Sequence, residues 1–253
     1  MIENHMSSSN YQSLKPTGLI LAAGRGSRMN NVTDTKPKCF IEVKGKRLLD
    51  WQVEAMKHAG ITDIAVVTGY KSELFSNEEI EKIHNPNWET TDMVFSLACA
   101  SDWLKKCNCI VSYSDIFFES HAVSSLLDGD EEIAISYDPS WLNMWEQRFE
   151  DPKDDAETFK VDNQQFLTEI GGAVTELDEV DGQYMGLIKF TPNGWKTFSN
   201  FWKEIEESDF SNVQVTQVLR QLVAKKSGYV KAIPYEGEWG ELDLESDLEY
   251  YNG

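Results

Sequence analysis

Short apolar runs alternate with amphipathic stretches along most of this chain. Runs rich in branched aliphatic residues predict strands at residues 17–21, 64–68, 109–112, 132–137 and 185–190. Between the first two runs, residues 47–59 place Leu49, Val53 and Met56 on one face, as in an amphipathic helix. Gly60 follows where helices commonly end in a left-handed glycine. The order strand, turn, helix, strand predicts a βαβ unit and therefore a parallel sheet.

A second helical pattern lies in the C-terminal third of the chain. Its large apolar residues recur at helical spacing: Trp195, Phe198, Phe201, Trp202 and Ile205. Such a stripe is typical of a helix face packed on a core, and less so of a platform for a ligand.

Domain organisation follows from what the chain lacks. It contains no internal repeat and no linker rich in Pro, Gly and Ser, and the polar residues 151–155 are expected to form a loop within one domain. We therefore expect one domain over residues 16–253. Residues 1–15 are polar and serine-rich, which predicts a disordered leader or a tag remnant.

The first predicted strand runs into a glycine turn at Gly24 and Gly26. In such a turn several backbone N–H groups can point into one concavity, which suits an anion such as a phosphate. Four cationic residues lie within the fourteen residues that begin in this turn: Arg25, Arg28, Lys36 and Lys38. The segment therefore predicts a polyphosphate site.

Charge is distributed unevenly along the chain. The whole chain has 23 basic and 43 acidic residues and a net charge of -20, yet residues 25–47 hold seven basic residues against two acidic ones. An acidic protein is a poor partner for nucleic acid or for an anionic membrane, because both are polyanions. The basic segment favours a phosphate site, and the alternative is an ordinary solvated charged surface.

The sequence has features that bear on the cellular compartment of the protein. No apolar run approaches the roughly 20 residues that span a bilayer, and the N-terminus lacks a secretory pattern. The four cysteines, Cys39, Cys99, Cys107 and Cys109, lack the spacing of a zinc site. We expect reduced, partly buried thiols in a cytoplasmic protein.

The glycine turn can be compared with three kinds of phosphate-binding loop. A P-loop is excluded, because no G-x-x-x-x-G-K-[ST] string occurs. A dinucleotide fingerprint is incomplete, because Met29 stands where the third glycine would be. Residues 21–28 read LAAGRGSR, and residues 36–38 read KPK. In this pairing of motifs the chain resembles the nucleoside-triphosphate transferase superfamily.

The resemblance extends along the chain and is strongest to small cytidylyltransferases acting on phosphocholine or on phosphonates such as 2-aminoethylphosphonate. The matching segments are residues 85–97, 112–115, 145–157, 182–187 and 239–243. The resemblance implies a single-domain α/β fold, Rossmann-like and GT-A-like, with a mixed, mostly parallel central sheet.

The resemblance also implies a reaction. An acceptor oxygen attacks the α-phosphorus of CTP and pyrophosphate leaves, with catalysis by positioning and electrostatics. The residues it implies for nucleotide binding are Leu21, Ala22, Ala23, Gly24, Arg25, Gly26, Ser27, Arg28, Lys38, Gly69, Asn85, Thr91 and Ser96. Catalytic roles fall on Arg28, Lys38 and Asp115. Mg²⁺ is the expected cofactor, held by Asp115 and Asp243, with Glu241 as an additional candidate.

The acceptor site is expected in the second half of the chain. The predicted residues are Trp145, Arg148, Glu157, Lys160 and Tyr184. This mixture of charges suits a zwitterion or a small phosphonate, so a phosphonate or aminoalkyl phosphate is favoured over phosphocholine. A sugar-1-phosphate nucleotidylyltransferase and an inactive nucleotide-binding regulatory module are the alternatives, and a homodimer is possible.

Overall fold

The computed structural model describes residues 14–206 and 213–253, so all but two residues of the predicted leader lie outside the described residues. A seven-stranded central sheet organises the fold, in the order β12-β8-β11-β6-β1-β4-β5. Its strands are β1 (Thr17–Ala22), β4 (Asp63–Thr68), β5 (Glu81–His84), β6 (Cys109–Tyr113), β8 (Ile133–Asp138), β11 (Gln183–Phe190) and β12 (Val230–Pro234). Only β11 runs antiparallel to its neighbours, β6 and β8. The mixed, mostly parallel sheet is confirmed.

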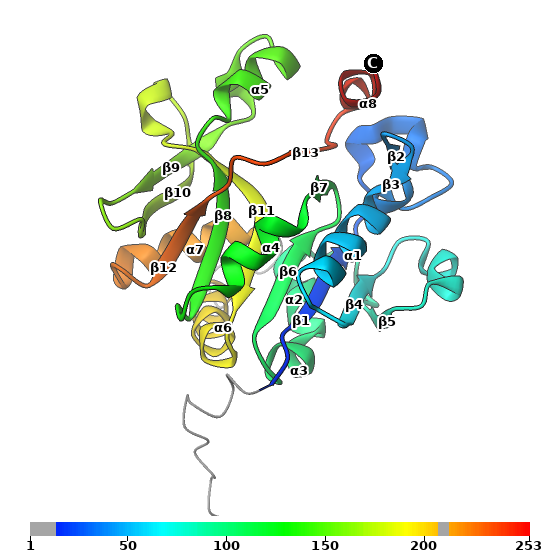
Figure 1. The fold of residues 1–253 in the computed structure, drawn as a ribbon, viewed down its shortest axis with the longest axis horizontal. Coiled ribbons are helices and arrows are strands. Elements are labelled where there is room, and N and C mark those ends of the chain that lie inside the picture. Colours follow the sequence, from blue (N-terminus) through cyan, green and yellow to red (C-terminus); the bar gives the residue numbers. More distant parts are fainter. Residues whose placement is uncertain (1–13, 207–212) are drawn as a thin grey trace, which may run out of the picture.

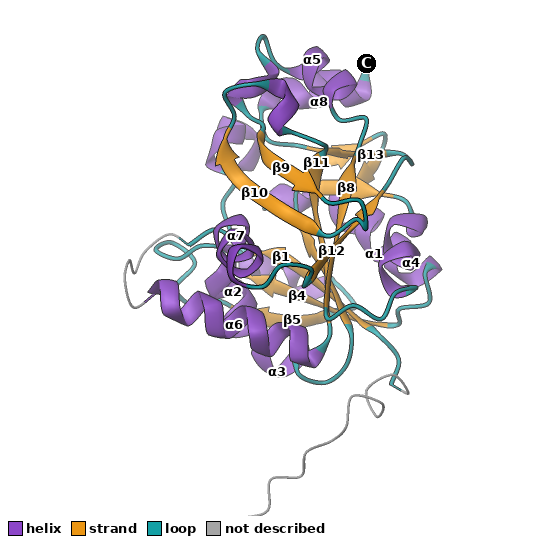
Figure 2. Cartoon of the chain, turned by 90° about the vertical axis from the view of Figure 1, so that its left-hand side faces the viewer, coloured by secondary structure: helices purple, strands orange, loops and turns teal. Residues whose placement is uncertain are grey.

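Helices cover both faces of the sheet, as Figure 2 shows. One face carries α1 (Leu48–His58) and α4 (Ser120–Leu127). The opposite face carries α2 (Met93–Cys99), α3 (Ser101–Leu104), α6 (Pro192–Glu206) and α7 (Val215–Lys225). Because both faces are covered, the inner strands are mostly apolar and almost fully buried.

Smaller elements gather at the rim where the parallel strands end. They are the pair β2 (Glu42–Val43) and β3 (Lys46–Arg47), the pair β7 (Ile116–Phe118) and β13 (Trp239–Glu241), the hairpin β9 (Glu157–Val161) and β10 (Leu167–Ala173), and the helices α5 (Leu142–Arg148) and α8 (Glu245–Asn252). In open α/β sheets, ligands bind beyond the carboxyl ends of the strands. The rim is therefore the place to look for a site.

The five predicted strands are all present, with ends that differ by one or two residues from the sequence patterns. The predicted helix is also present as α1, and it ends in a Schellman motif. Gly60 has φ +89°, its N–H donates to Lys57, and the N–H of Ile61 donates to Met56, both at 3.0 Å. The glycine closes the helix because it adopts the left-handed conformation without strain.

The aromatic stripe of α6 faces the core, as predicted. Trp195 and Phe198 are buried and their rings lie 5.9 and 5.2 Å from the ring of Phe190 in β11. Burying each such side chain contributes about 1.5–3 kcal/mol. Across residues 14–206 and 213–253, no helix has the length and apolar character needed to cross a membrane.

Candidate active site

Lys38 lies between two carboxylates at the rim. Its Nζ is 3.0 Å from Oδ2 of Asp115 and 2.9 Å from Oδ1 of Asp243, and its side chain is only 9% exposed. Burial would lower the pKa of Lys38, but the two carboxylates raise it above its ordinary value. The ammonium is therefore charged at any physiological pH.

Three separate segments build this cluster. Lys38 begins the second of two 3-10 helices after the glycine turn (Lys38–Phe40), Asp115 lies between β6 and β7, and Asp243 follows β13. The backbone N–H of Leu242 donates to the Asp115 carbonyl at 2.8 Å, which fastens two of the segments together. Gly26, at φ +67°, leaves room for the Lys38 stem, since a Cβ there would lie 3.0 Å from Lys38 Cδ.

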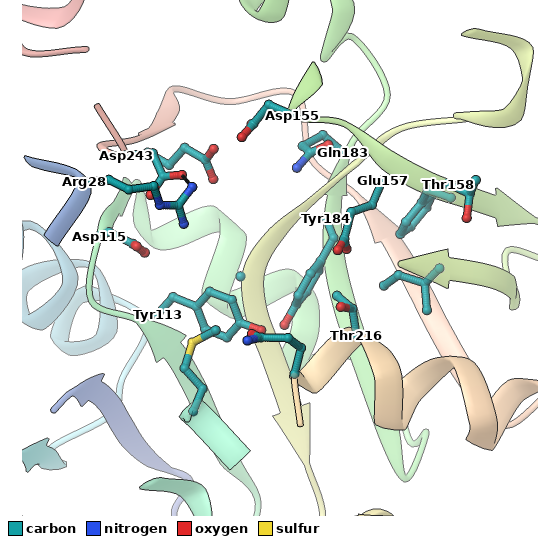
Figure 3. Close-up of a pocket in the computed structure, with 16 residues that line it drawn as sticks. Arg28, Tyr113, Asp115, Asp155, Glu157, Thr158, Gln183, Tyr184, Thr216 and Asp243 are labelled. Atoms are coloured by element: carbon teal, nitrogen blue, oxygen red, sulfur yellow. Dashed lines mark hydrogen bonds and ion pairs between the residues drawn. The ribbon is translucent and has the colours of Figure 1, made fainter. Parts of the chain in front are cut away.

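Arg28 reaches the same cluster from the glycine turn. Its guanidinium donates to Oδ2 of Asp243 while 68% of its side chain stays exposed (Figure 3). Asp243 thus accepts from two cations, Arg28 and Lys38. The structure brings together all three predicted catalytic residues and both predicted metal ligands.

The other basic residues of residues 25–47 do not converge on this cluster. Arg25 pairs with Asp34 at the surface. Lys44, Lys46 and Arg47 also have carboxylate partners elsewhere. Of the basic segment, only Arg28 and Lys38 contact Asp115 or Asp243, so the phosphate site rests on two of the four cations that the sequence offered.

A cavity of about 360 Å³ opens beside the cluster. Arg28, Asp115 and Asp243 form one side of it (Figure 3). The opposite side carries polar and aromatic groups from β9, β11 and α7: Glu157, Thr158, Gln183, Tyr184 and Thr216. Loss of solvent around the Glu157 carboxyl raises its pKa. One side of the cavity therefore combines the Arg28 guanidinium with the carboxylates of Asp115 and Asp243, and the opposite side carries the Glu157 carboxylate.

A second cavity, of about 200 Å³, adjoins the first and shares Met93 and Gln214 with it. The glycine turn forms one wall and residues 88–96 form the other. Five predicted nucleotide-binding residues line it: Leu21, Ala23, Gly24, Thr91 and Ser96. The second cavity thus gathers predicted nucleotide-binding residues beside the cavity that Arg28, Asp115 and Asp243 line.

Two other predicted nucleotide-binding residues support this wall without lining it. Asn85 is fully buried, and its amide donates to the hydroxyls of Thr91 and Ser96 at 3.1 Å each. Gly69 permits the close approach of Trp88, because a Cβ on Gly69 would lie 2.5 Å from that of Trp88. Asn85 therefore orients the two hydroxyls, and Gly69 sets the place of the indole.

Asp115 and Asp243 suit a magnesium ion chemically. Mg²⁺ usually takes one or two carboxylates and completes its shell with water and substrate phosphates. No cluster of three or more His, Cys, Asp or Glu side chains suited to a metal occurs among the described residues, so a pair of carboxylates is the available donor set. Glu241 also lines the cavity, but burial raises the pKa of its carboxyl to about 8, with Arg148 acting in the opposite direction.

The acceptor residues predicted from the sequence separate into two groups. Glu157 and Tyr184 line the larger cavity. The structure does not bring the other three there. Trp145 is fully buried, and Arg148 forms buried ion pairs behind the site. Lys160 pairs with Asp181 on the outside of the hairpin.

Several cavity residues were not predicted. Asp155 and Gln183 lie within the motif segments, but no pattern singled them out. Trp88 lies in the matching segment 85–97, but the sequence assigned it no role. Gln214 and Thr216 belong to the start of α7, where the sequence shows only an amphipathic helix, so their place in the site depends on packing.

Comparisons with known proteins identify the family of this chain. Residues 18–142 match the family model described as MobA-like NTP transferase domain. Over 247 residues the chain is 37% identical to CTP:phosphoglutamine cytidylyltransferase of Campylobacter jejuni, covering 91% of this chain and 97% of that protein.

Solved structures share the fold at low identity. A putative glucose-1-phosphate thymidylyltransferase from Bacillus anthracis gives a TM-score of 0.75 at 16% identity, covering 94% of both chains. The CTP:phosphocholine cytidylyltransferase of Streptococcus pneumoniae gives 0.69 at 18% identity, covering 94% of this chain and 97% of that one. From the family model and the near full-length relative, this chain belongs to the MobA-like NTP transferase family.

Proposed function

We propose that this protein is a magnesium-dependent cytidylyltransferase that transfers CMP from CTP to a small phosphorylated or phosphono acceptor. The observation that carries the proposal is the position of Lys38, held between Asp115 and Asp243, which line the larger of two adjoining cavities. One cavity suits a base and the other suits an acceptor, so the α-phosphate of a bound nucleotide would lie near the cluster.

The chemistry requires an acceptor oxygen to bond to the α-phosphorus of CTP while the bond to the pyrophosphate oxygen breaks. Both reactants are anions, so repulsion and alignment dominate the barrier. Lys38 and Arg28 supply positive charge beside the reacting phosphate and the leaving pyrophosphate. Magnesium, held by Asp115 and Asp243, would add charge neutralisation at the phosphates.

The preference for CTP rests on two observations. The Campylobacter jejuni relative is named for CTP, and it matches nearly the whole chain. The base-side cavity measures only about 200 Å³, and it presents the hydroxyls of Thr91 and Ser96. A small cavity with fixed hydroxyls suits the edge of a pyrimidine.

For the acceptor, we propose a zwitterion that carries a phosphate or phosphonate and a protonated amine. Arg28 and Lys38 would bind the anionic end, and the Glu157 carboxylate would bind the ammonium. A phosphoglutamine-like compound fits this description, since glutamine carries an α-ammonium, and so does 2-aminoethylphosphonate. Phosphocholine is less favoured, because its quaternary ammonium needs several aromatic faces and Trp145 is not in the cavity.

Pyrophosphate release with each of the four NTPs and a panel of acceptors tests the proposal. The panel contains phosphoglutamine, 2-aminoethylphosphonate, phosphocholine and glucose-1-phosphate. We expect turnover with CTP and with an amine-bearing acceptor. Turnover only with the hexose phosphate would establish the sugar nucleotidylyltransferase instead, and no turnover with any pair would support the inactive regulatory module.

A further inference from the structure

A fully buried ion pair lies directly behind Asp243. The side chain of Arg148, the last residue of α5, is 0% exposed, and that of Asp247, in the first turn of α8, is 1% exposed. The guanidinium forks onto the carboxylate, with Nε 3.0 Å from Oδ1 and Nη2 3.1 Å from Oδ2. Buried charges are costly to desolvate, so a pair of this kind needs its remaining hydrogen bonds completed.

The remaining hydrogen bonds of Asp247 go to the backbone of Asp243. Oδ2 of Asp247 accepts from the N–H of Asp243 at 2.7 Å and from the N–H of Leu244 at 2.8 Å. Nη1 of Arg148 also lies 3.3 Å from Oε1 of Glu241. The guanidinium thus contacts carboxylates that precede and follow Asp243 in the chain.

Aromatic rings hold the guanidinium in this place. Its central carbon lies 4.8 Å from the ring of Trp145 and 5.0 Å from the ring of Phe149. Trp145 is itself fully buried against Trp239 of β13. The position of Arg148 is therefore fixed by packing as well as by charge. Asp247, held by Arg148, in turn fixes the backbone of Asp243 by accepting its N–H.

We propose that Arg148 is a positioning residue for the transfer reaction: through Asp247 it fixes the backbone of Asp243, and hence the carboxylate that meets Lys38 and Arg28. Arg148 contacts none of the reacting groups itself. The inference rests on the proposed function for its catalytic part, and its structural part stands on the hydrogen bonds alone. α5 also leads into the segment that carries Asp155 and Glu157, so the same residue joins the two sides of the larger cavity.

Arg148→Lys tests the proposal, because lysine keeps the charge but cannot form the fork. Arg47→Lys is the matched control: Arg47 forks onto Asp50 and also binds Glu78, two carboxylates that form no ion pair with Lys38 or Arg28. Two quantities are measured in each protein: steady-state kinetics with CTP, and backbone hydrogen exchange in the substrate-free, metal-free protein.

For Arg148→Lys we expect kcat to fall about 10- to 100-fold while KM for CTP changes less than about threefold, as for a displaced catalytic group. Exchange should accelerate at Asp243 and Leu244 but not in β1 or β6. Arg47→Lys should show neither effect. Should Arg148→Lys fail to fold, Asp247→Asn removes the charged fork from the other side and should give the same pattern.

Two results would overturn the proposal: wild-type kcat in Arg148→Lys, or a loss of kcat accompanied by equally faster exchange in β1 and β6, which would mean general destabilisation. A wild-type protein that transfers no CMP would refute the proposed function instead. In that case the exchange rates at Asp243 and Leu244 would still decide whether Arg148 fixes this backbone.

Discussion

Lys38 and Asp243 are separated by 205 positions in the chain, yet Nζ of Lys38 lies 2.9 Å from Oδ1 of Asp243. This contact joins the glycine-turn segment to the C-terminal segment. It places the ammonium of Lys38 against a carboxylate that lines the larger cavity.

Lys38→Met should lower kcat by roughly 100-fold or more, because a preorganised charge beside the developing transition state is lost. KM for CTP should change much less, since the cavity that would take the base is untouched. Lys36→Met is the matched control, two residues earlier in the same segment, and should keep wild-type kinetics. Equal losses in the two variants would show that the segment needs positive charge in general and not an ammonium at Lys38.

Asp115→Asn and Asp243→Asn should each abolish most turnover and weaken Mn²⁺ binding measured by titration calorimetry in the presence of CTP. Chelation of the metal should stop turnover by the wild-type protein, and added Mg²⁺ should restore it. Asp34→Asn, which removes the surface partner of Arg25, should behave as wild type. Near-normal kcat in Asp115→Asn would refute the proposed metal site.

Gly69→Ala should raise KM for CTP about tenfold with a smaller effect on kcat. The new Cβ would lie 2.5 Å from the Cβ of Trp88 and 2.6 Å from the carbonyl oxygen of Ala23, so the backbone that forms the wall of the base-side cavity must shift. Trp88→Gly removes both contacts with the Trp88 side chain, while the contact with the Ala23 carbonyl remains, and the double variant should therefore lose less than the sum of the two single effects. Strict additivity would mean that Gly69 does not act through Trp88.

The KM for the acceptor should rise as pH falls below neutrality. Because the pKa of Glu157 is raised above its ordinary value, its carboxylate is protonated at a higher pH than usual and then no longer attracts an ammonium. The acceptor phosphate also titrates, with a second pKa near about 6. Glu157→Gln isolates the two effects: it should have a higher KM at neutral pH and a weaker dependence on pH. A pH profile identical to that of wild type would contradict the role of Glu157.

Lys189 offers a stability test away from the site. It is fully buried in β11, donates to the Gly129 carbonyl, and has its pKa lowered by burial, which Glu131, Asp130 and Glu132 partly oppose. Between that lowered pKa and 10.5 the unfolded chain binds more protons, so stability should rise with pH. The gain is about 1.4 kcal/mol for each unit of lowering.

Urea unfolding at a series of pH values between 7 and 10 compares the wild type with Lys189→Met, which cannot titrate. We expect the stability of the wild type to rise with pH relative to the variant. Lys196→Met, at an exposed position of α6, should show no such divergence. Parallel curves for the wild type and Lys189→Met would mean that Lys189 keeps an ordinary pKa in the folded protein.

Local pattern was sufficient for much of the architecture. The strands are continuous apolar runs because both faces of the sheet are covered, and the end of α1 follows from Gly60. The glycine turn and Lys38 were identified because their spacing is itself the signal. The prediction that Arg148 lies in the acceptor site was wrong, because the sequence shows its charge but does not show that its side chain is buried against Asp247.

By itself, the sequence predicted the mostly parallel α/β sheet and the glycine turn, which depend on local periodicity and on a short motif, and the family resemblance carried by such motifs implied the roles of Lys38, Asp115 and Asp243. Tertiary structure decided which charged side chains form ion pairs and which line the cavity. It paired Arg25 with Asp34, directed Arg28 and Lys38 to Asp243, and placed Glu157 in the cavity. The physical reason is that an ion pair depends on distance in space, and only the packing of segments far apart in the chain sets that distance.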